Sequence, residues 1–481
     1  RSLAVKRPAI YSRFSPDDAL SVATVRQALQ NKLEKKVQIS RMERRIIQIE
    51  ERLPLAQTIP LSLQHLFAMF GATVLVPFLF KVDPATSLLM NGVGTLVYLF
   101  FSQGRIPAYL GSSFAFIAPV FAVMSAPEMG GYAAAQGGFI MFGLFFVLVS
   151  FIVRAAGTRW LDVIFPPAAM GAIVAIIGLE LAPTATEMAG LTGKLVEQLK
   201  IPYATAITVS MFTLAVTILG SVLLRGFLAV IPVLIGVMSG YALSLYMGIV
   251  DLNSIVTAPW FALPTFYKPV FNVSAILMIM PAALVVLAEH IGHLVVTANI
   301  VERDLIKDPG LHRSLLGDGI SNILSGFAGA TPNTTYGENI GVMAITKVFS
   351  VWVIGGAAVF AICVSFIGKF AAVVRSIPVP VMGGVCILLF GVIAAAGIRM
   401  LIEKQVDYTK ARNLILTSVV LIIGISGAAV KFGTVELKGM ALATVVAIST
   451  SLLFALFEHL GWANDQEPST PTIHVVDEKK K

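Results

Sequence analysis

Long apolar blocks without a single charged residue constrain this chain more than any other feature of its sequence. Five of them cover residues 201–224, 226–250, 376–398, 413–430 and 439–457. A helix needs roughly 20 apolar residues to cross the hydrocarbon core of a bilayer, and each block reaches or nearly reaches that length. A membrane β-barrel would instead show short segments of alternating hydrophobicity. The blocks therefore predict a helical protein that crosses a membrane several times.

The composition excludes an ordinary soluble protein. Of the 481 residues, 57% are hydrophobic and only 13% are charged, whereas soluble domains contain about 25% charged residues. Fourteen apolar segments lie between residues 54 and 460, so we predict an all-α polytopic membrane protein with 14 transmembrane segments. Cys363 and Cys386 lie in apolar runs without CxxC spacing, which argues against a disulfide framework and a cysteine metal site.

Both ends of the chain are polar. Residues 1–53 contain twelve Lys and Arg against six Asp and Glu, and a basic end of this kind fits a cytoplasmic location better than nucleic-acid binding. With both ends in the cytoplasm, twelve further basic residues fall in inside loops and eight in outside loops. Residues 1–41 differ from the rest, so we expect either an extension before a native start at Met42 or a genuine tail. Residues 461–481 predict a polar cytoplasmic tail.

An internal repeat is visible in two short patterns. Pro166-x-x-x-Met170-Gly171 recurs as Pro378-x-x-x-Met382-Gly383, and Arg225-Gly226 recurs as Lys438-Gly439 at nearly the same offset. Each half then holds seven spans, an odd number, so the second half must enter the membrane in the opposite sense. Inverted repeats are typical of secondary transporters. The predicted halves are residues 54–250 and 272–460, joined by an extracytoplasmic linker at 251–271.

Two of the fourteen segments are short, around residues 111–124 and 335–350. Both begin with a polar run that contains Gly, and each is the third segment of its half. Irregular backbone at membrane depth is tolerated only where it lines a cavity. A half-helix that starts there offers unpaired N–H groups and a partial positive charge. These two segments therefore predict the position of a binding site.

Glu289 is the most conspicuous ionisable residue inside a predicted span, where such residues are costly and mark function. His293 follows four residues later on the same helix face, so the two can touch. A carboxylate beside an imidazole at low dielectric can exchange a proton near neutral pH. The alternative is a structural pair that holds two helices together. A zinc-protease site is disfavoured, because His290 and His293 are three residues apart and the Glu precedes both.

Glu338 stands where the second half-helix is predicted to begin. A neutral planar ligand would suit this place, because carboxylates accept from its NH groups and backbone N–H groups donate to its C=O groups. The alternative for Glu338 is a helix cap. The Phe114 ring could be a stacking surface or could simply pack. Gln64, His65 and Asp318 are further polar residues in spans, and for Asp318 we favour an interhelical hydrogen bond.

At these residues the chain resembles the nucleobase–ascorbate transporter family. Glu338-Asn339-x-Gly341-x4-Thr346-Lys347 is similar to the family signature, which reads Gln/Glu-Asn-x-Gly-x4-Thr-Arg/Lys. Gln64-His65 resembles the Gln-His pair of its first span. The runs 288–304 and 331–347 are similar to the bacterial uracil-transporting members, and the similarity covers about residues 53–460.

The resemblance implies a fold and a function. The fold is two inverted seven-span repeats, divided into a core domain (spans 1–4 and 8–11) and a gate domain (spans 5–7 and 12–14). Short strands precede the half-helices of spans 3 and 10. The function is import of uracil with protons across the bacterial inner membrane, without enzymatic activity or any cofactor beyond the proton-motive force. A homodimer through the gate domains is also implied, and the small residues at Gly383-Gly384 and 424–429 would permit close helix contact either there or within one protomer.

The resemblance also implies the roles of individual residues. The Glu289 and Glu338 side chains would hold uracil together with backbone groups at Phe114 and Gly337, close to Tyr336 and His293. Glu289 and His293 would couple transport to protons, and Gln64, His65, Asn339 and Asp318 would support the site. Asp318 departs from the Asn that is usual in the bacterial uracil-transporting members.

Other functions are weaker interpretations of the same sequence. Purine-transporting members commonly carry Gln where this chain has Glu338, so uracil is favoured over xanthine or another nucleobase. An anion exchanger of the same architecture would place Arg, Lys or bare helix N-termini at its site, and two carboxylates would repel its substrate. A membrane-embedded hydrolase would need a nucleophile paired with a base, and the serines show no such partner.

Overall fold

The computed structural model of the chain describes residues 46–192, 201–433 and 435–462. The expectations for residues 1–41 and for the tail beyond residue 462 therefore lie outside the described residues. The chain divides into one unit of residues 1–47 and a second that begins at Gln48. Everything below concerns the second unit.

The first half of this unit is helical, and several helices start with Pro in the first turn, where its missing N–H would have no partner. The α-helices are α2 (Leu55–Ala68), α3 (Phe70–Phe80), α4 (Pro84–Phe101), α5 (Ile117–Met124), α6 (Gly131–Ala156), α7 (Arg159–Ile164), α8 (Pro167–Glu180), α9 (Ala182–Met188), α11 (Tyr203–Leu223), α12 (Pro232–Tyr246) and α13 (Asn253–Thr257). Strand β1 (Leu110–Ser112) and the short helices η1 (Phe114–Phe116), η2 (Pro127–Met129) and η3 (Gly226–Val230) complete it.

The second half of this unit is also mainly helical. Its helices are α14 (Val273–Val301), η4 (Ile306–Gly310), α15 (Leu311–Ala328), α16 (Gly337–Thr346), α17 (Val351–Ser365), α18 (Gly368–Arg375), α19 (Val379–Glu403), α20 (Ala411–Ile425) and α21 (Gly439–His459). Strand β2 (Asn333–Thr335) pairs with β1, while β3 (Ala429–Phe432) and β4 (Val435–Lys438) form an antiparallel hairpin.

Among the described residues, seven helices are long and apolar enough to cross a membrane, or eight if the bent pair α2–α3 is one span. Four shorter apolar helices accompany them: η1 with α5, α12, α17 and α20. The chain is therefore an all-α polytopic membrane protein, as predicted. Each of the fourteen predicted segments contains a helix. Two of these helices, α15 and α16, are neither among the long apolar helices nor among the shorter apolar ones.

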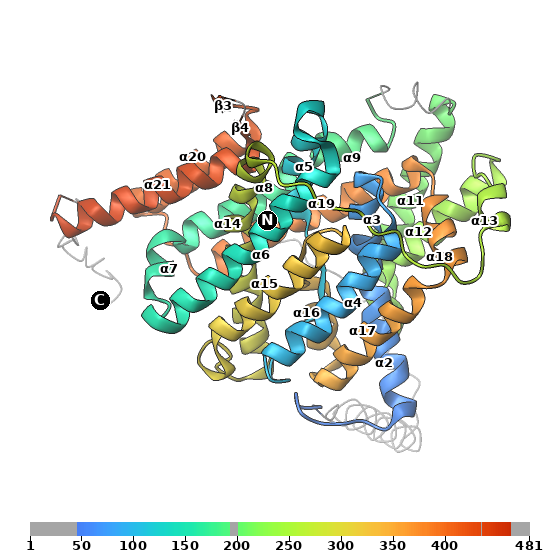
Figure 1. Cartoon of the computed structure of the whole chain (residues 1–481), viewed down its shortest axis with the longest axis horizontal. Coiled ribbons are helices and arrows are strands. Elements are labelled where there is room, and N and C mark those ends of the chain that lie inside the picture. Colours follow the sequence, from blue (N-terminus) through green and yellow to red (C-terminus); the bar gives the residue numbers. More distant parts are fainter. Residues whose placement is uncertain (1–45, 193–200, 434, 463–481) are drawn as a thin grey trace, which may run out of the picture. The chain divides into compact units, whose positions relative to one another are not determined.

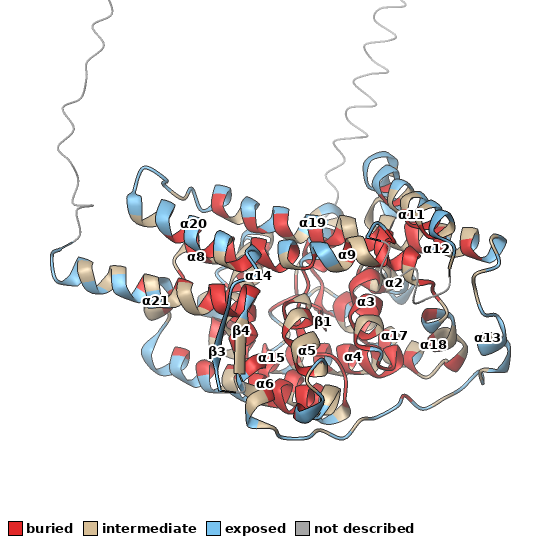
Figure 2. Cartoon of the chain, turned by 90° about the horizontal axis from the view of Figure 1, so that it is seen from above, coloured by how far each residue is buried: buried red, intermediate tan, exposed pale blue. Residues whose placement is uncertain are grey.

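Helix packing sorts most of these helices into two groups. In the α15 group, α15 packs on α4 and α6, α17 packs on α2 and α4, and α14 packs on α6. In the α19 group, α19 packs on α8, α9 and α11, α12 packs on α11, and α20 packs on α8 and α21. Figure 1 labels these elements. In Figure 2, α8, α19 and α20 lie along one side, α4, α6 and α15 lie along the other, and β1 lies between them.

The two sequence patterns of the repeat have matching backbone conformations. Pro166 and Pro378 each immediately precede a helix, with φ −60° and ψ 151° at Pro166 and φ −62° and ψ 142° at Pro378. Gly226 and Gly439 both have positive φ, at 63° and 55°. Glycine adopts this region without the steric penalty that other residues meet. The recurring residues thus mark equivalent turns in the two halves.

Three of the small residues that we considered for close helix contact pack within the chain, whereas residues 426–429 are exposed. A Cβ on Gly383 would lie 2.2 Å from the backbone of Ala189, and one on Gly384 would lie 2.3 Å from the backbone of Ser210. A Cβ on Gly424 would lie 2.4 Å from the side chain of Ile176. Of the two roles considered for these glycines, the structure shows close packing inside one protomer.

Exposed ion pairs join segments that lie far apart in the sequence. The Arg303 guanidinium donates to both carboxylate oxygens of Glu50, at 2.5 and 3.0 Å. These hydrogen bonds lower the pKa of Glu50 below its ordinary value. Arg105 donates from one nitrogen, Nη1, to both carboxylate oxygens of Asp308, at 2.7 and 3.0 Å. Because both pairs are exposed to solvent, each contributes at most about 1 kcal/mol to stability.

A buried carboxylate at the start of α4 forms a hydrogen bond with the linker at 251–271. Asp83 accepts hydrogen bonds from the backbone N–H of Ala85 at 3.1 Å and of Thr265 at 3.0 Å, and from the Arg375 guanidinium at 3.2 Å. Thr86 donates its hydroxyl to the Thr265 carbonyl at 2.6 Å. These contacts border a cavity of about 470 Å³ between the linker and α18. The linker is thereby attached to the α15 group at α4.

Candidate functional site

A two-stranded antiparallel ladder forms the centre of the candidate site. Strands β1 and β2 pair over three residues, with Gly111 opposite Thr334. Two further backbone hydrogen bonds extend the ladder, from Tyr336 N to Tyr109 O at 3.0 Å and from Ser113 N to Pro332 O at 2.8 Å. All six strand residues are buried. A short helix starts directly after each strand, so the ladder fixes where both half-helices begin.

Tyr336 locks the two strands together. Its side chain is buried, and its hydroxyl donates to the backbone carbonyl of Ser112 at 3.0 Å. A Cβ on Gly111 would lie only 2.3 Å from two ring carbons of Tyr336. The absence of a side chain at Gly111 therefore lets the Tyr336 ring cross β1. Tyr336 has a structural contact here in addition to the ligand role that the resemblance implies.

We expect Gly111→Ala to destabilise the protein, because the added methyl group displaces the Tyr336 ring and its hydrogen bond to Ser112. Overpacking of this kind costs about 1–3 kcal/mol. The loss is measured as a lower unfolding temperature of the purified protein in detergent. Gly391→Ala is the matched control, since a Cβ there meets nothing within 4 Å. Equal unfolding temperatures for the two variants would contradict this prediction.

The start of α16 is accessible, in contrast to the strand before it. Residues 333–336 are buried, whereas Gly337 and Glu338 are exposed. Glu338 lies in the first turn of α16, where the partial positive charge of the helix favours a carboxylate. Among the described residues, no other side chain forms a hydrogen bond to this carboxylate, and the residue before the helix makes no side-chain cap. Glu338 therefore has free acceptor capacity at an accessible helix start.

Helix α14 brings Glu289 and His293 to the same place. It contacts η1, β2 and α16, and both residues are half-buried. A Cβ on Gly337 would lie 3.3 Å from His293 Nε2, so the imidazole borders the start of α16. His293 Nδ1 lies 3.0 Å from Thr335 Oγ1. Although Glu289 and His293 share a helix face, no hydrogen bond joins them among the described residues, because His293 is directed to Thr335.

His65 and Asn339 lie behind the start of α16 and hold it against α2. Asn339 Nδ2 lies 3.0 Å from His65 Nδ1 and 3.3 Å from the His65 carbonyl oxygen. In this geometry the Asn339 amide is in contact with both the ring and the backbone of His65. Both side chains are buried, as is that of Gln64. His65 and Asn339 therefore connect the helix start to α2, and none of the three side chains is accessible at its surface.

Phe114 connects the site to the α19 group. Its half-buried ring meets Phe390 of α19 edge to face, with the ring centroids 6.0 Å apart. Of the two roles considered, packing is the one that the structure shows for this ring.

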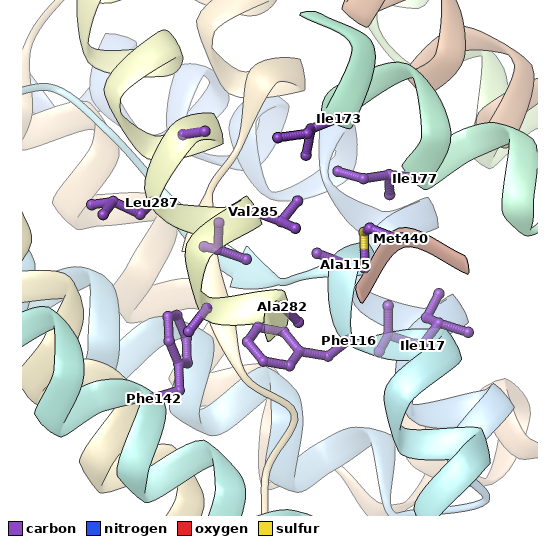
Figure 3. Close-up of a cluster of buried hydrophobic side chains, with 14 of the residues drawn as sticks. Ala115, Phe116, Ile117, Phe142, Ile173, Ile177, Ala282, Val285, Leu287 and Met440 are labelled. Atoms are coloured by element: carbon purple, nitrogen blue, oxygen red, sulfur yellow. The ribbon is translucent and has the colours of Figure 1, made fainter. Parts of the chain in front are cut away.

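Next to Phe114 lies an apolar cluster in which α14 and η1 meet α8 and α21. Figure 3 shows Val285 on the side of Ile173, Ile177 and Met440, whereas the Phe116 ring is directed toward Phe142. Apolar side chains therefore form one part of the contact between the two helix groups.

Asp318 lies apart from the accessible residues. It is fully buried, and its Oδ2 lies 2.9 Å from His290 Nδ1 of α14, so its side chain makes a polar contact between two helices. Ser314 and Asn322 lie four residues to either side of it on α15 and also have buried polar contacts. We missed this polar stripe, although its four-residue spacing is visible in the sequence. No cluster of three or more metal-ligating side chains occurs in the described part of the chain.

Comparison with known proteins places the chain in a family. Residues 56–433 match the permease family. The uracil permease of Escherichia coli (strain K12) is 66% identical over 419 residues, covering 87% of this chain and 96% of that protein. The uracil permease of Paenibacillus larvae subsp. larvae is 60% identical over 424 residues, covering 88% and 100%.

Solved structures of low sequence identity share the fold. The transmembrane domain of the cyanobacterial bicarbonate transporter BicA has a TM-score of 0.54 at 14% identity, covering 86% of this chain and 99% of that chain. Murine Slc26a9, an anion transporter in the inward-facing state, has a TM-score of 0.63 at 12% identity, covering 85% and 69%. These two matches concern the fold alone. The extensive match of the chain and its close relatives confirm the resemblance indicated by the Glu338–Lys347 motif, and the protein belongs to the permease family.

Proposed function

We propose that this protein is a uracil permease that imports uracil together with protons across the bacterial cytoplasmic membrane. The observation that carries the proposal is the pair of carboxylates, Glu289 and Glu338, beside an accessible helix start. Relatives that are 60–66% identical are uracil permeases. Membership of a permease family makes the chain a transporter and not an enzyme.

The chemistry of the site suits uracil. Uracil is neutral and planar and presents both NH donors and C=O acceptors along its edge. The carboxylates of Glu338 and Glu289 can accept from its NH groups, and backbone N–H groups near Gly337 and Phe114 can donate to its C=O groups. His293 borders the same space, so it can adjust the charge of Glu289 when a proton arrives.

Uptake of labelled uracil into proteoliposomes tests the proposal. An inward proton gradient should drive accumulation, and a protonophore should abolish it. Unlabelled uracil should compete with the label, whereas xanthine should compete weakly. Uptake at the same rate with and without the proton gradient would refute proton symport. Stronger competition by xanthine than by unlabelled uracil would favour a purine substrate.

An anion exchanger is the alternative suggested by the shared fold. The BicA match is a bicarbonate transporter, but its identity to this chain is only 14%. The candidate site presents two carboxylates and no Lys or Arg side chain, and such a site repels an anion. Bicarbonate-driven or chloride-driven exchange in the same proteoliposomes would support this alternative.

We further propose that the α15 group is the core domain and the α19 group is the gate domain. The core then contains α2–α6 and α14–α17, and the gate contains α8, α9, α11, α12 and α19–α21, which is the division implied by the resemblance. Residues 54–250 and 272–460 would be fourteen spans in two inverted repeats, with both termini in the cytoplasm. The antiparallel pairing of β1 with β2 and the matching turns at Pro166 and Pro378 support this arrangement.

The proposed cycle begins when a proton from the outside reaches Glu289. Uracil then binds, the core rocks against the gate, and both are released inside. Protonation removes a charge that would be expensive to carry between the two access states. The apolar cluster around Phe116 and Ile173 supports such a motion, since attraction between apolar side chains is not directional.

We also expect a homodimer joined through the gate domains, with one substrate site in each protomer. The gate must stay still while the core moves. In a single protomer surrounded by fluid lipid, no other protein contact would hold the gate domain in place. Mass photometry in nanodiscs measures the assembly directly, and its main species should have twice the protomer mass. A fully active preparation that consists only of monomers would exclude the dimer as a requirement.

A further inference from the structure

A chain of buried polar side chains runs behind the candidate site, from α14 through α15 to β2. It starts at His290, the neighbour of Glu289 in sequence, which lies on the buried side of α14. His290 Nε2 lies 2.7 Å from Ser314 Oγ, which in turn lies 2.7 Å from the Tyr98 hydroxyl. His290 Nδ1 lies 2.9 Å from Asp318 Oδ2. Both nitrogens of this imidazole therefore lie close to polar side-chain atoms of α15.

Asn322 continues the chain to the strand. Its Nδ2 donates to Asp318 Oδ1 at 2.9 Å and to the Asn333 carbonyl at 3.1 Å, while its Oδ1 accepts from Asn333 N at 2.6 Å. One side-chain amide thus binds both backbone groups of Asn333, as a neighbouring strand would. Because β1 is the only strand that pairs with β2 in the described structure, Asn322 supplies hydrogen bonds that a further strand would otherwise provide.

The side chain of Asn333 is held as firmly as its backbone. Its Nδ2 lies 3.0 Å from Ser321 Oγ and 3.1 Å from Ser325 Oγ, both on α15. Glu338 follows only five residues later, at the start of α16. The position of β2 relative to α15 therefore decides where the Glu338 carboxylate lies.

We infer that Asn322 is a positioning residue for substrate binding, and that it acts with Asp318 and His290 to set Glu338 of α16 against Glu289 of α14. None of these three residues is accessible to a ligand, since all are fully buried. The network instead links the turn of α14 that carries Glu289 to the strand that precedes Glu338. The inference rests on the proposed uracil site. It adds the residues that fix the positions of Glu289 and Glu338 relative to each other.

Asn322→Leu tests the inference, because leucine has a similar volume and cannot form the hydrogen bonds to Asn333. We expect uracil affinity in calorimetry to fall about tenfold or more. Backbone amides of residues 333–346 should also exchange faster in hydrogen–deuterium exchange without ligand. Gln136→Leu is the matched control, since it removes a buried amide that binds the Tyr267 carbonyl at 3.2 Å and forms no hydrogen bond with the network among the described residues. It should change neither the affinity nor the exchange of residues 333–346.

Asp318→Asn is the second variant and separates positioning from a need for charge. The new amide can place its oxygen toward Asn322 and its nitrogen toward His290. His290 can then change tautomer, because the Ser314 hydroxyl beside Nε2 can accept as well as donate. We therefore expect Asp318→Asn to bind uracil within about threefold of wild type, whereas Asp318→Leu should lose binding as Asn322→Leu does.

The outcomes distinguish this inference from the proposed function. Wild-type affinity and exchange in a folded Asn322→Leu protein would overturn the inference. Loss of binding in Asp318→Asn equal to that in Asp318→Leu would also overturn it, because the carboxylate charge would then be required. If the wild-type protein does not bind uracil while Asn322→Leu still accelerates exchange at residues 333–346, the proposed function fails and the positioning role stands.

Discussion

Replacing Glu338 with Gln is expected to abolish or severely weaken uracil binding. The carboxylate is exposed at the start of α16 and has no side-chain partner of its own among the described residues. A neutral amide would present either an NH2 group or a poorer acceptor to the NH groups of the ligand. The loss of a charge-assisted hydrogen bond is worth about 1.5–3 kcal/mol, which is roughly a 10- to 150-fold loss of affinity. Isothermal titration calorimetry of the purified protein measures it.

Glu128→Gln is the matched control for this experiment, because Glu128 is also exposed and lies in the short helix η2. It should bind uracil with wild-type affinity. Near-wild-type binding by Glu338→Gln would remove Glu338 from the site. A partial change of preference toward purines would instead support its role, since an amide offers the donor that a carboxylate lacks.

Replacing Glu289 with Gln should eliminate proton-driven accumulation. Glutamine mimics the neutral, protonated side chain permanently, so the site can no longer gain and release a proton between the two access states. With one proton per uracil, a pH difference of one unit can drive about tenfold accumulation in the wild-type protein. In Glu289→Gln proteoliposomes the internal uracil concentration should only reach the external one, at every imposed pH difference.

Exchange of internal for external uracil provides the control for Glu289→Gln. It requires binding and the conformational change but no net proton movement, so it reports on whether the variant still folds and cycles. A variant that exchanges uracil but does not concentrate it would place the coupling step at Glu289. If Glu289→Gln still concentrates uracil and responds to pH, the coupling group is a different carboxylate.

The sequence was sufficient to predict the class of fold, because the bilayer limits the possibilities. Without water to satisfy its backbone groups, a lipid-exposed segment must be helical, so each long charge-free block could be assigned as a helix. The short helices α5 and α16 were also predictable, since a polar Gly-containing run shortens the apolar segment that follows. Glu289 and Glu338 were found for the same reason: a charged residue is conspicuous where nearly all neighbours are apolar.

Local spacing was less informative about which groups bind each other. The four-residue spacing correctly put Glu289 and His293 on one helix face. In the folded chain, however, His293 binds Thr335, which is 42 residues away. Spacing along a helix fixes the direction of a side chain around the axis, but it does not identify the neighbouring element in that direction. The same limit applies to Gly383 and Gly384, whose small size predicted a close contact without naming the partner.

The sequence by itself thus determined that the chain is a polytopic helical membrane protein with two shortened helices and two carboxylates beside them. Only the tertiary structure decided that β1 and β2 pair across half the chain, that Tyr336 fills the space above Gly111, and that Asn322 holds Asn333. The physical reason is that apolar periodicity and the cost of buried charge act within one segment and can be read from it. Hydrogen bonds between distant segments depend instead on which helices become neighbours, and that is settled when the whole chain packs.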